Sequence, residues 1–406
     1  IVTGLAWSDA QGRPLLKEPE VELVHDLSMP TGDGGRYGFD RLALTSQALT
    51  ARVEGAATVH DQDTELEATL DLAGDPNRLA GILRQVFGED YQDLRGTGRL
   101  KGRLVLAGGT SAGFKTLRVD GNLDPGGWSA GGLTLSQATL TVKRAAVQDP
   151  LRLTFEGGVN GGRMDLGFGV RLGRAPNAWT VDLRMQRVDT SPLLVDHGAG
   201  EYLAWFLPTL VPSDRQGPVL NGLLDAEIAM RAADLGDRLE PTLGGEGFVR
   251  MDKGSSGETT HFRAVGGGGG LGQVGNLLVK AIPEVGEALA GLQRSTTFTK
   301  MESQFDVAKR VVNVRKGLLD GERTRVDFKG TVGFNEAVNL DLSLTFAGTA
   351  GKRLKKVLGS ETIPMKVTGT MDKPRVQPRI DASKLATGAL GDLIPGDGKN
   401  PLDRLK

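Results

Sequence analysis

Apolar and polar residues alternate one by one through much of this chain. In residues 340–346, LDLSLTF, every second residue is Leu or Phe, and the residues between them are Asp, Ser and Thr. Successive side chains of a β-strand point to opposite faces, so this segment predicts a strand with one apolar and one polar face. The alternation recurs in segments that begin at Met164, Trp179, Leu224 and Val326. The chain is therefore predicted to be a long series of one-sided strands.

The composition argues against several classes of protein. The 49 Lys and Arg residues nearly balance the 50 Asp and Glu residues, which gives no electrostatic reason to expect a nucleic acid as the partner. Aromatic residues make up 5%, too few for a platform on which bases stack. With no cysteine, disulfides and thiolate metal sites are excluded. No run of 18 apolar residues occurs, so no membrane-spanning helix is expected within this sequence.

Three segments interrupt the strand pattern with helical spacing or apolar clustering: residues 78–87, 191–211 and 271–292. The last has apolar residues at i, i+3, i+4 and i+7 over several turns, and Pro283 is expected to kink it. We expect a division into a repeated β segment over residues 1–217, a second β region over 218–381 and a flexible tail over 382–406.

No catalytic or metal-binding pattern stands out. Gly270–Gly275 matches G-x-G-x-x-G, but the parallel strand and the acidic residue that a dinucleotide site needs do not follow, so a glycine hinge is the favoured interpretation. The four histidines lie singly and lack metal-ligand spacing: His25, His60, His197 and His261. We therefore predict a protein that is not an enzyme, with no cofactor and no metal.

What covers the apolar faces is left open by the residues alone. One possibility is an ordinary core, with two sheets packed together or one sheet packed on helices. The other is a single long sheet that curls into an aliphatic trough able to hold acyl chains. Glycine, at 59 of 406 residues, is roughly twice as frequent as usual and supports continuous curvature.

The order of several C-terminal motifs resembles a known family. These motifs are LEPTLGGEGFVRMDKG (residues 239–254), the amphipathic segment 271–292, the strand-like segments 296–307 and 311–348, and IPMKVTGTMDKPRV (residues 363–376). Taken together, they are similar to the AsmA-like family of bacterial envelope proteins, relatives of TamB and of the eukaryotic bridge-like lipid transfer proteins. The resemblance covers residues 220–381 best and earlier segments only in style.

The resemblance implies an elongated, mostly β protein whose curled antiparallel sheet forms a taco-like hydrophobic groove with a few short amphipathic helices. It implies a place in the periplasm, tethered to the inner membrane by a segment upstream of this sequence. The implied partners are phospholipids, the inner and outer membranes, and envelope proteins that extend the groove. The implied function is a non-enzymatic conduit for phospholipid between the two membranes.

The alternating apolar residues are assigned to the lining of that groove: Met164, Leu166, Phe168, Val170, Val181, Leu183, Met185, Ile228, Met230, Val326, Phe328, Leu340, Leu342, Leu344 and Phe346. Two other functions stay open. The first is a structural or assembly factor for outer-membrane protein biogenesis that conducts no lipid. The second is an enzyme that uses the glycine-rich loop as a nucleotide site.

Overall fold

The computed structural model describes residues 2–8, 14–29, 35–60, 63–87, 94–109, 116–130, 132–171, 178–191, 220–233, 239–256, 282–294, 296–371 and 373–380. They fall into two compact units. Unit 1 comprises Ile1–Val188 and Ala229–Thr242, and unit 2 comprises Asp189–Ile228 and Leu243–Lys406. The predicted boundary between residues 217 and 218, most of the predicted segment 191–211, the predicted tail and Gly270–Gly275 lie outside the described residues.

Unit 1 is built almost entirely of strands, as the period-two alternation predicts. Its strands are β1 (Val2–Ser8), β2 (Pro14–Ser28), β3 (Gly35–Ser46), β4 (Leu49–His60), β5 (Asp63–Gly74), β6 (Arg95–Thr97), β7 (Leu100–Gly109), β8 (Arg118–Asp124), β9 (Gly127–Ala130), β10 (Leu133–Arg144), β11 (Leu151–Val159), β12 (Gly162–Val170) and β13 (Trp179–Asp189). Strand β14 (Leu220–Ala232) contributes residues to both units.

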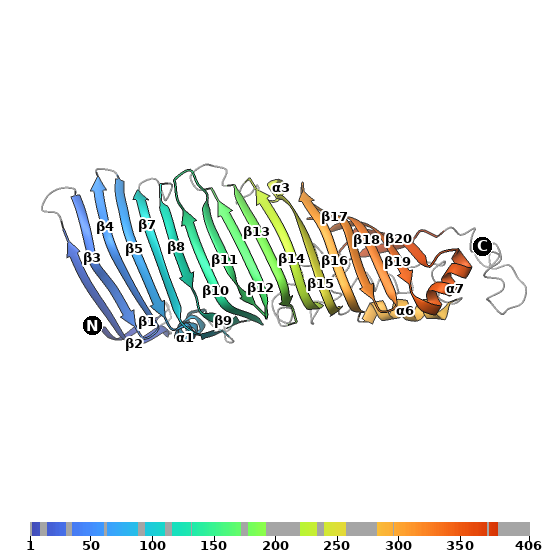
Figure 1. Cartoon of the computed structure of the whole chain (residues 1–406), viewed down its shortest axis with the longest axis horizontal. Coiled ribbons are helices and arrows are strands. Elements are labelled where there is room, and N and C mark those ends of the chain that lie inside the picture. The colour runs from blue at the N-terminus through green and yellow to red at the C-terminus, as the bar shows by residue number, and fades with distance from the viewer. Residues whose placement is uncertain are drawn as a thin grey trace, which may run out of the picture. The chain divides into compact units, whose positions relative to one another are not determined.

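The strands of unit 1 form an antiparallel meander. β1 to β5 pair in chain order, β5 then pairs with β7, β7 with β8 and β8 with β10. β10 to β13 again pair in chain order, and the short β9 and β6 extend from β10. Figure 1 shows β3 to β13 as neighbouring arrows that run from blue to green. Hairpin connections of this kind keep sequence neighbours side by side, so one face of every strand joins one continuous surface.

Unit 2 repeats this arrangement with its own strands: β15 (Gly244–Ser256), β16 (Thr296–Ala308), β17 (Val311–Gly321), β18 (Thr324–Gly333), β19 (Ala337–Phe346), β20 (Thr362–Thr370) and β21 (Pro374–Pro378). Each strand pairs antiparallel with the next in chain order. The last strand, β21, begins and ends with proline, which suits an edge because proline lacks the backbone donor that a further strand would need.

Two described helices agree with the predicted helical segments. Helix α1 (Pro76–Phe87) matches the prediction over 78–87, and the Asp75 carboxylate caps it by accepting the Asn77 N–H at 2.9 Å. Helix α6 (Pro283–Arg294) covers the second half of the predicted segment 271–292. Pro283 stands at the first position of α6, where its missing N–H costs nothing, rather than inside the described helix.

The predicted second β region, residues 218–381, also contains a helix that the strand pattern did not predict. Helix α7 (Gly348–Leu358) follows β19 and ends at Gly359, which adopts the left-handed conformation with φ of 75°. Its buried residues Leu354, Val357 and Leu358 stand at i, i+3 and i+4, so the amphipathic signal is present but short. A brief helical turn, α3 (Leu239–Thr242), completes the described helices. The predicted fold class, a mostly β, curled antiparallel sheet with a few short helices, is confirmed.

Candidate functional site

One face of the unit 1 sheet is apolar from strand to strand. The pairing register aligns residues of neighbouring strands into rows that cross the sheet, and paired residues share a face. One row runs through Leu42, Val53, Leu70, Leu104, Gly121, Val142, Leu153, Phe168 and Val181. A second row runs through Leu44, Ala51, Leu72, Gly102, Leu123, Leu140, Phe155, Leu166 and Leu183. We call this surface the apolar face of unit 1.

The side chains of the apolar face are only partly covered. Of the predicted lining residues in unit 1, these are half-buried: Met164, Leu166, Phe168, Val181, Leu183, Met185 and Met230. Val170 is buried, and Ile228, in the part of β14 that belongs to unit 2, is half-buried. Exposure rises toward β2 and β3, where Leu44 is 39% exposed and its register partner Leu23 is 52% exposed. An apolar surface of this extent with access to solvent is typical of a binding surface.

Arg144 interrupts the next row of the apolar face near one end of the strands. It pairs in register with Val119 and is 1% exposed. Its guanidinium donates to the carbonyl oxygens of Leu117 at 3.0 Å, Val147 at 2.6 Å and Asp149 at 3.2 Å. A buried cation whose donors are used in this way ties the loop after β10 to the sheet and marks the edge of the apolar face.

The opposite face of unit 1 carries the charges. Its rows contain Arg52, Asp71 and Arg103 in register, and the Arg103 and Asp71 side chains approach to 3.9 Å. On β12, Arg163 pairs with Asp165 at 2.9 Å. The two faces therefore divide as the alternation predicts, with charges in water on one side and aliphatic groups on the other.

The corresponding face of unit 2 is a dry core. The predicted lining residues there are 0–3% exposed: Val326, Phe328, Leu340, Leu342, Leu344 and Phe346. The buried residues Ile282 and Val285, at the start of α6, and Leu354 and Val357, of α7, belong to the same core. Helix α7 contacts β19 and β20, and α6 contacts β16 and α7. A lining role for these six residues would therefore need α6 and α7 to move away from the sheet.

Close packing seals this core. A row in unit 2 runs through Val249, Ser303, Gly317, Phe328, Leu342 and Met365. The Phe328 ring occupies the space of the missing Gly317 side chain, because a Cβ built there would lie 2.1 Å from the ring. The buried Ser303 hydroxyl has no hydrogen-bond partner within the described residues. The side chains of this mostly apolar row are thus closely packed and leave no open space along it.

The charged groups of unit 2 make structural ion pairs. Glu302, 6% exposed, accepts hydrogen bonds from Lys300 at 2.6 Å and from Lys316 at 2.9 Å. The hydrogen bond from Lys300, together with that from Lys316, lowers the pKa of Glu302 below its usual value against the opposing effect of burial. The described residues contain no group of three or more His, Asp or Glu side chains that could hold a metal ion. The pair of Glu302 with Lys316 joins β16 to β17, and Lys300 lies on the same strand as Glu302.

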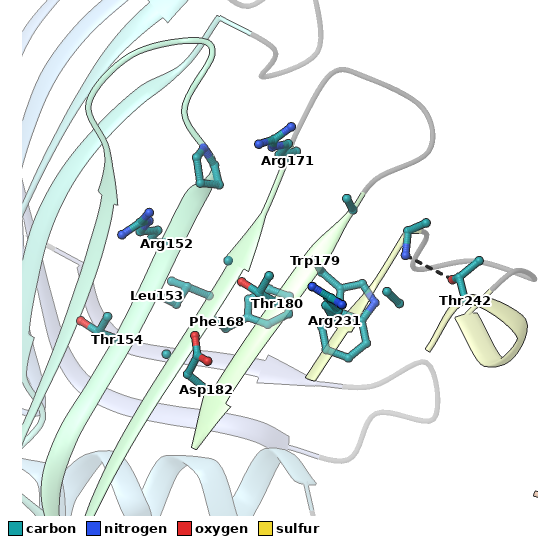
Figure 2. Close-up of a pocket in the computed structure, with 16 residues that line it drawn as sticks. Arg152, Leu153, Thr154, Phe168, Arg171, Trp179, Thr180, Asp182, Arg231 and Thr242 are labelled. Carbon is teal, nitrogen blue, oxygen red and sulfur yellow. Dashed lines mark hydrogen bonds between the residues drawn. The ribbon is translucent and has the colours of Figure 1, made fainter. Parts of the chain in front are cut away.

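One hollow of about 710 Å³ lies on the polar side of unit 1, and sequence reasoning missed it. Its lining includes Arg152, Gly167, Arg171 and Arg231, which are not in the predicted lining set, and one residue that is, Phe168 (Figure 2). The sequence signal for this hollow was Gly167, a glycine at a polar-face position of a strand. That signal is weak, because any polar residue at this position would fit the alternation equally well.

Among the described helices, none has the length and apolar character needed to cross a membrane. Comparison of the chain with protein-family models, with curated proteins and with solved structures finds no significant match. The function must therefore be argued from the two faces of the sheet.

Proposed function

We propose that this chain is a non-enzymatic lipid-transfer module and that acyl chains lie against the apolar face of unit 1. The observation that carries the proposal is the pair of continuous apolar rows from β3 to β13, whose side chains are half-buried or exposed rather than sealed. A face that crosses so many strands without a charged residue in these two rows is long enough to accept extended hydrocarbon.

The physical driving force is the transfer of hydrocarbon out of water. Each CH₂ group that leaves water contributes about 0.8 kcal/mol. Because Leu, Val and Phe recur along each row, an acyl chain meets a similar surface at each strand. Similar affinity at successive positions lets a lipid move without a chemical step, so the proposal needs no cofactor. A charged head group would stay in solvent beyond the strand ends.

The resemblance to AsmA-like proteins supports phospholipid as the lipid class and a bacterial envelope as the setting. In this proposal, the chain acts in the periplasm between the inner and outer membranes, and other envelope proteins continue its surface. The balanced charge of the chain, 49 basic against 50 acidic residues, is consistent with a hydrophobic rather than an electrostatic partner.

Lipid mass spectrometry on the purified chain tests the proposal. Detergent-free protein is extracted with organic solvent, and the phospholipid is quantified against protein. We expect near-stoichiometric phospholipid from the wild type and its loss from Phe168→Asp, which places a charge on the apolar face. Gln186→Asp adds the same charge to the opposite face of β13 and should retain lipid. Circular dichroism and thermal unfolding establish that each variant is folded. A lipid-free extract from folded wild type would contradict the proposal.

A second function is favoured by one observation. The sealed core of unit 2, with Leu340, Val326 and Phe346 at 0–1% exposure, is what a structural or assembly factor for outer-membrane proteins would need. If purified chain carries no lipid yet remains folded, this alternative gains support. Stable binding of an unfolded outer-membrane β protein to the chain, unaffected by Phe168→Asp, would favour it further.

A further inference from the structure

The hollow on the polar side of unit 1 is formed near the ends of β11, β12, β13 and β14. Figure 2 shows its labelled side chains around the ends of these strands, with Arg152, Arg171 and Arg231 on different strands or strand ends. Thr154, Thr180, Thr242 and Asp182 complete the polar lining. All of these residues belong to unit 1.

Two glycines of β12 open the hollow. In the pairing register, Gly167 lies between Thr154 and Asp182, and Gly169 lies between Arg152 and Thr180. Side chains on both neighbouring strands therefore flank two positions at which no side chain stands. This arrangement leaves room above the middle strand.

The backbone at Gly167 does not require glycine. A Cβ built there would lie 3.8 Å from the Asp182 Cβ, an ordinary van der Waals contact, and its φ lies outside the left-handed region. Glycine inside a strand weakens it, because its backbone loses more freedom on folding and no side chain packs. What the missing side chain provides at this position is the space above it.

The hollow carries uncompensated positive charge. Within the described residues, no carboxylate lies within 4.0 Å of the Arg152, Arg171 or Arg231 guanidinium, and Asp182 is the sole carboxylate of the lining. Some arginines on other strand surfaces are paired, as in Arg250 with Asp252 at 2.8 Å and Arg325 with Asp327 at 2.9 Å. Three arginines against one aspartate leave a local surplus of two charges in a chain whose net charge is −1.

We propose that this hollow binds a small molecule with a phosphate group. The planar guanidinium offers forked N–H donors that match phosphate oxygens, and Thr154 and Thr180 add hydroxyl donors beside them. The volume of about 710 Å³ exceeds that of the phosphate alone, so a ligand with an organic part fits.

The phosphate could belong to a free phosphomonoester or to a lipid head group, and the position is compatible with both. Arg171 and Ala178, which line the hollow, are joined by a backbone hydrogen bond of 2.9 Å just beyond β12 and β13. The apolar row Leu151, Val170 and Trp179 ends at the same strand ends on the other face. The binding site itself does not depend on the lipid-transfer proposal, since it lies on the opposite face.

Calorimetric titration of the full chain with two probes tests this inference. Glycerol 3-phosphate represents a free phosphomonoester, and dihexanoyl phosphatidic acid below its micellar concentration represents a lipid head group. We expect Arg152→Gln and Arg231→Gln each to weaken binding about tenfold, because a hydrogen bond to a charged group is lost. Gly167→Gln should weaken binding by occupying the space above Gly167 that the ligand would enter. Arg118→Gln removes an exposed charge on the same face outside the hollow and should leave the affinity unchanged.

Asp182→Asn is the most discriminating variant. It should strengthen binding severalfold, because it removes the repulsion between the Asp182 carboxylate and the phosphate. A merely structural role for Asp182 would not give such a gain. Equal affinity for both probes would identify a free phosphomonoester, and tighter binding of the acylated probe would identify a head group. Absence of binding by folded wild type, or equal weakening in Arg118→Gln, would overturn the inference. Either result would leave the lipid content of the wild-type protein unaffected, so the two proposals fail separately.

Discussion

Phe168 on β12 stands directly opposite Val181 on β13, and its ring centre lies 6.3 Å from that of Trp179. All three side chains are half-buried. They form part of the apolar face of unit 1. Hydrophobic side chains on the neighbouring strands flank them, but the described residues do not cover them completely on the side away from the sheet. The same alternation in unit 2 ends in a sealed core, so the two units use one sequence pattern in two ways.

Because the apolar side chains of unit 1 are partly exposed and those of unit 2 are buried, a charge introduced on each should lower the free energy of unfolding by different amounts. Leu183→Asp should lower the free energy of unfolding by about 1–2 kcal/mol, since Leu183 already has access to water. Leu342→Asp, at a position 3% exposed, should cost about 4 kcal/mol or prevent unit 2 from folding. Urea unfolding followed by circular dichroism measures both. Similar costs at the two positions would show that the apolar face of unit 1 is covered in solution.

Two strand glycines should respond oppositely to substitution by alanine. Gly317→Ala pushes a Cβ into the Phe328 ring and should destabilise the protein by about 1–3 kcal/mol. Gly167→Ala meets no close contact and should leave stability unchanged or raise it by up to about 1 kcal/mol. Thermal unfolding of the two variants under identical conditions compares them. A destabilised Gly167→Ala would mean that the backbone there needs glycine, which would remove one argument for the phosphate site.

Glu302 should make the stability of the protein depend on pH in the acidic range. Its pKa is lowered in the folded state by the Lys300 and Lys316 ammonium groups, so its contribution is present above the unfolded pKa of about 4.3. That contribution is lost as the pH falls through the lowered folded value. Glu302→Gln should cost about 1–2 kcal/mol at pH 7, and the cost should shrink below about pH 4. Unfolding free energies of both proteins from pH 3 to pH 7 test this, and a cost independent of pH would contradict it.

Among the described residues, an ion pair joins α6 and α7 in unit 2. The Arg353 guanidinium lies 2.8 Å from Glu284 Oε1, while the buried Oε2 has no partner among the described residues. Arg353→Ala should therefore loosen α6, leaving a partly buried carboxylate without its cation, at a cost of about 1 kcal/mol. Amide hydrogen exchange should become faster in α6 and stay unchanged in β3 to β5, far along the chain. Unchanged exchange in α6 would mean that its apolar contacts alone hold it.

The alternation of single residues was enough to predict strands and to assign side chains to faces. Met164, Leu166 and Phe168 share a face with Val181 and Leu183, because side chains in strands alternate and hairpins preserve the register. The degree of cover could not be predicted in the same way. Leu183 and Leu342 have the same local pattern, but only the second lies in a core shared with α6 and α7.

The short helix α7 and the hollow were missed for local reasons. Within GTAGKRLKKVL, only Leu354, Val357 and Leu358 give the helical signal, and the flanking strands dominate the pattern. At the hollow, the informative feature is an absent side chain at Gly167, which a strand tolerates without changing its alternation. Its meaning depends on the arginines that neighbouring strands and β14 bring beside it, and these come from positions far apart in the sequence.

Site-directed photocrosslinking tests the central claim most directly. A benzophenone amino acid is placed at Leu183 on the apolar face, at Gln186 on the polar face, or at Leu342 in the unit 2 core, and the folded protein is irradiated in the presence of phospholipid. The account predicts a phospholipid adduct by intact mass at Leu183 and none at Gln186 or Leu342. No adduct at Leu183, or equal adducts at Leu183 and Gln186, would contradict the claim that acyl chains lie on the apolar face.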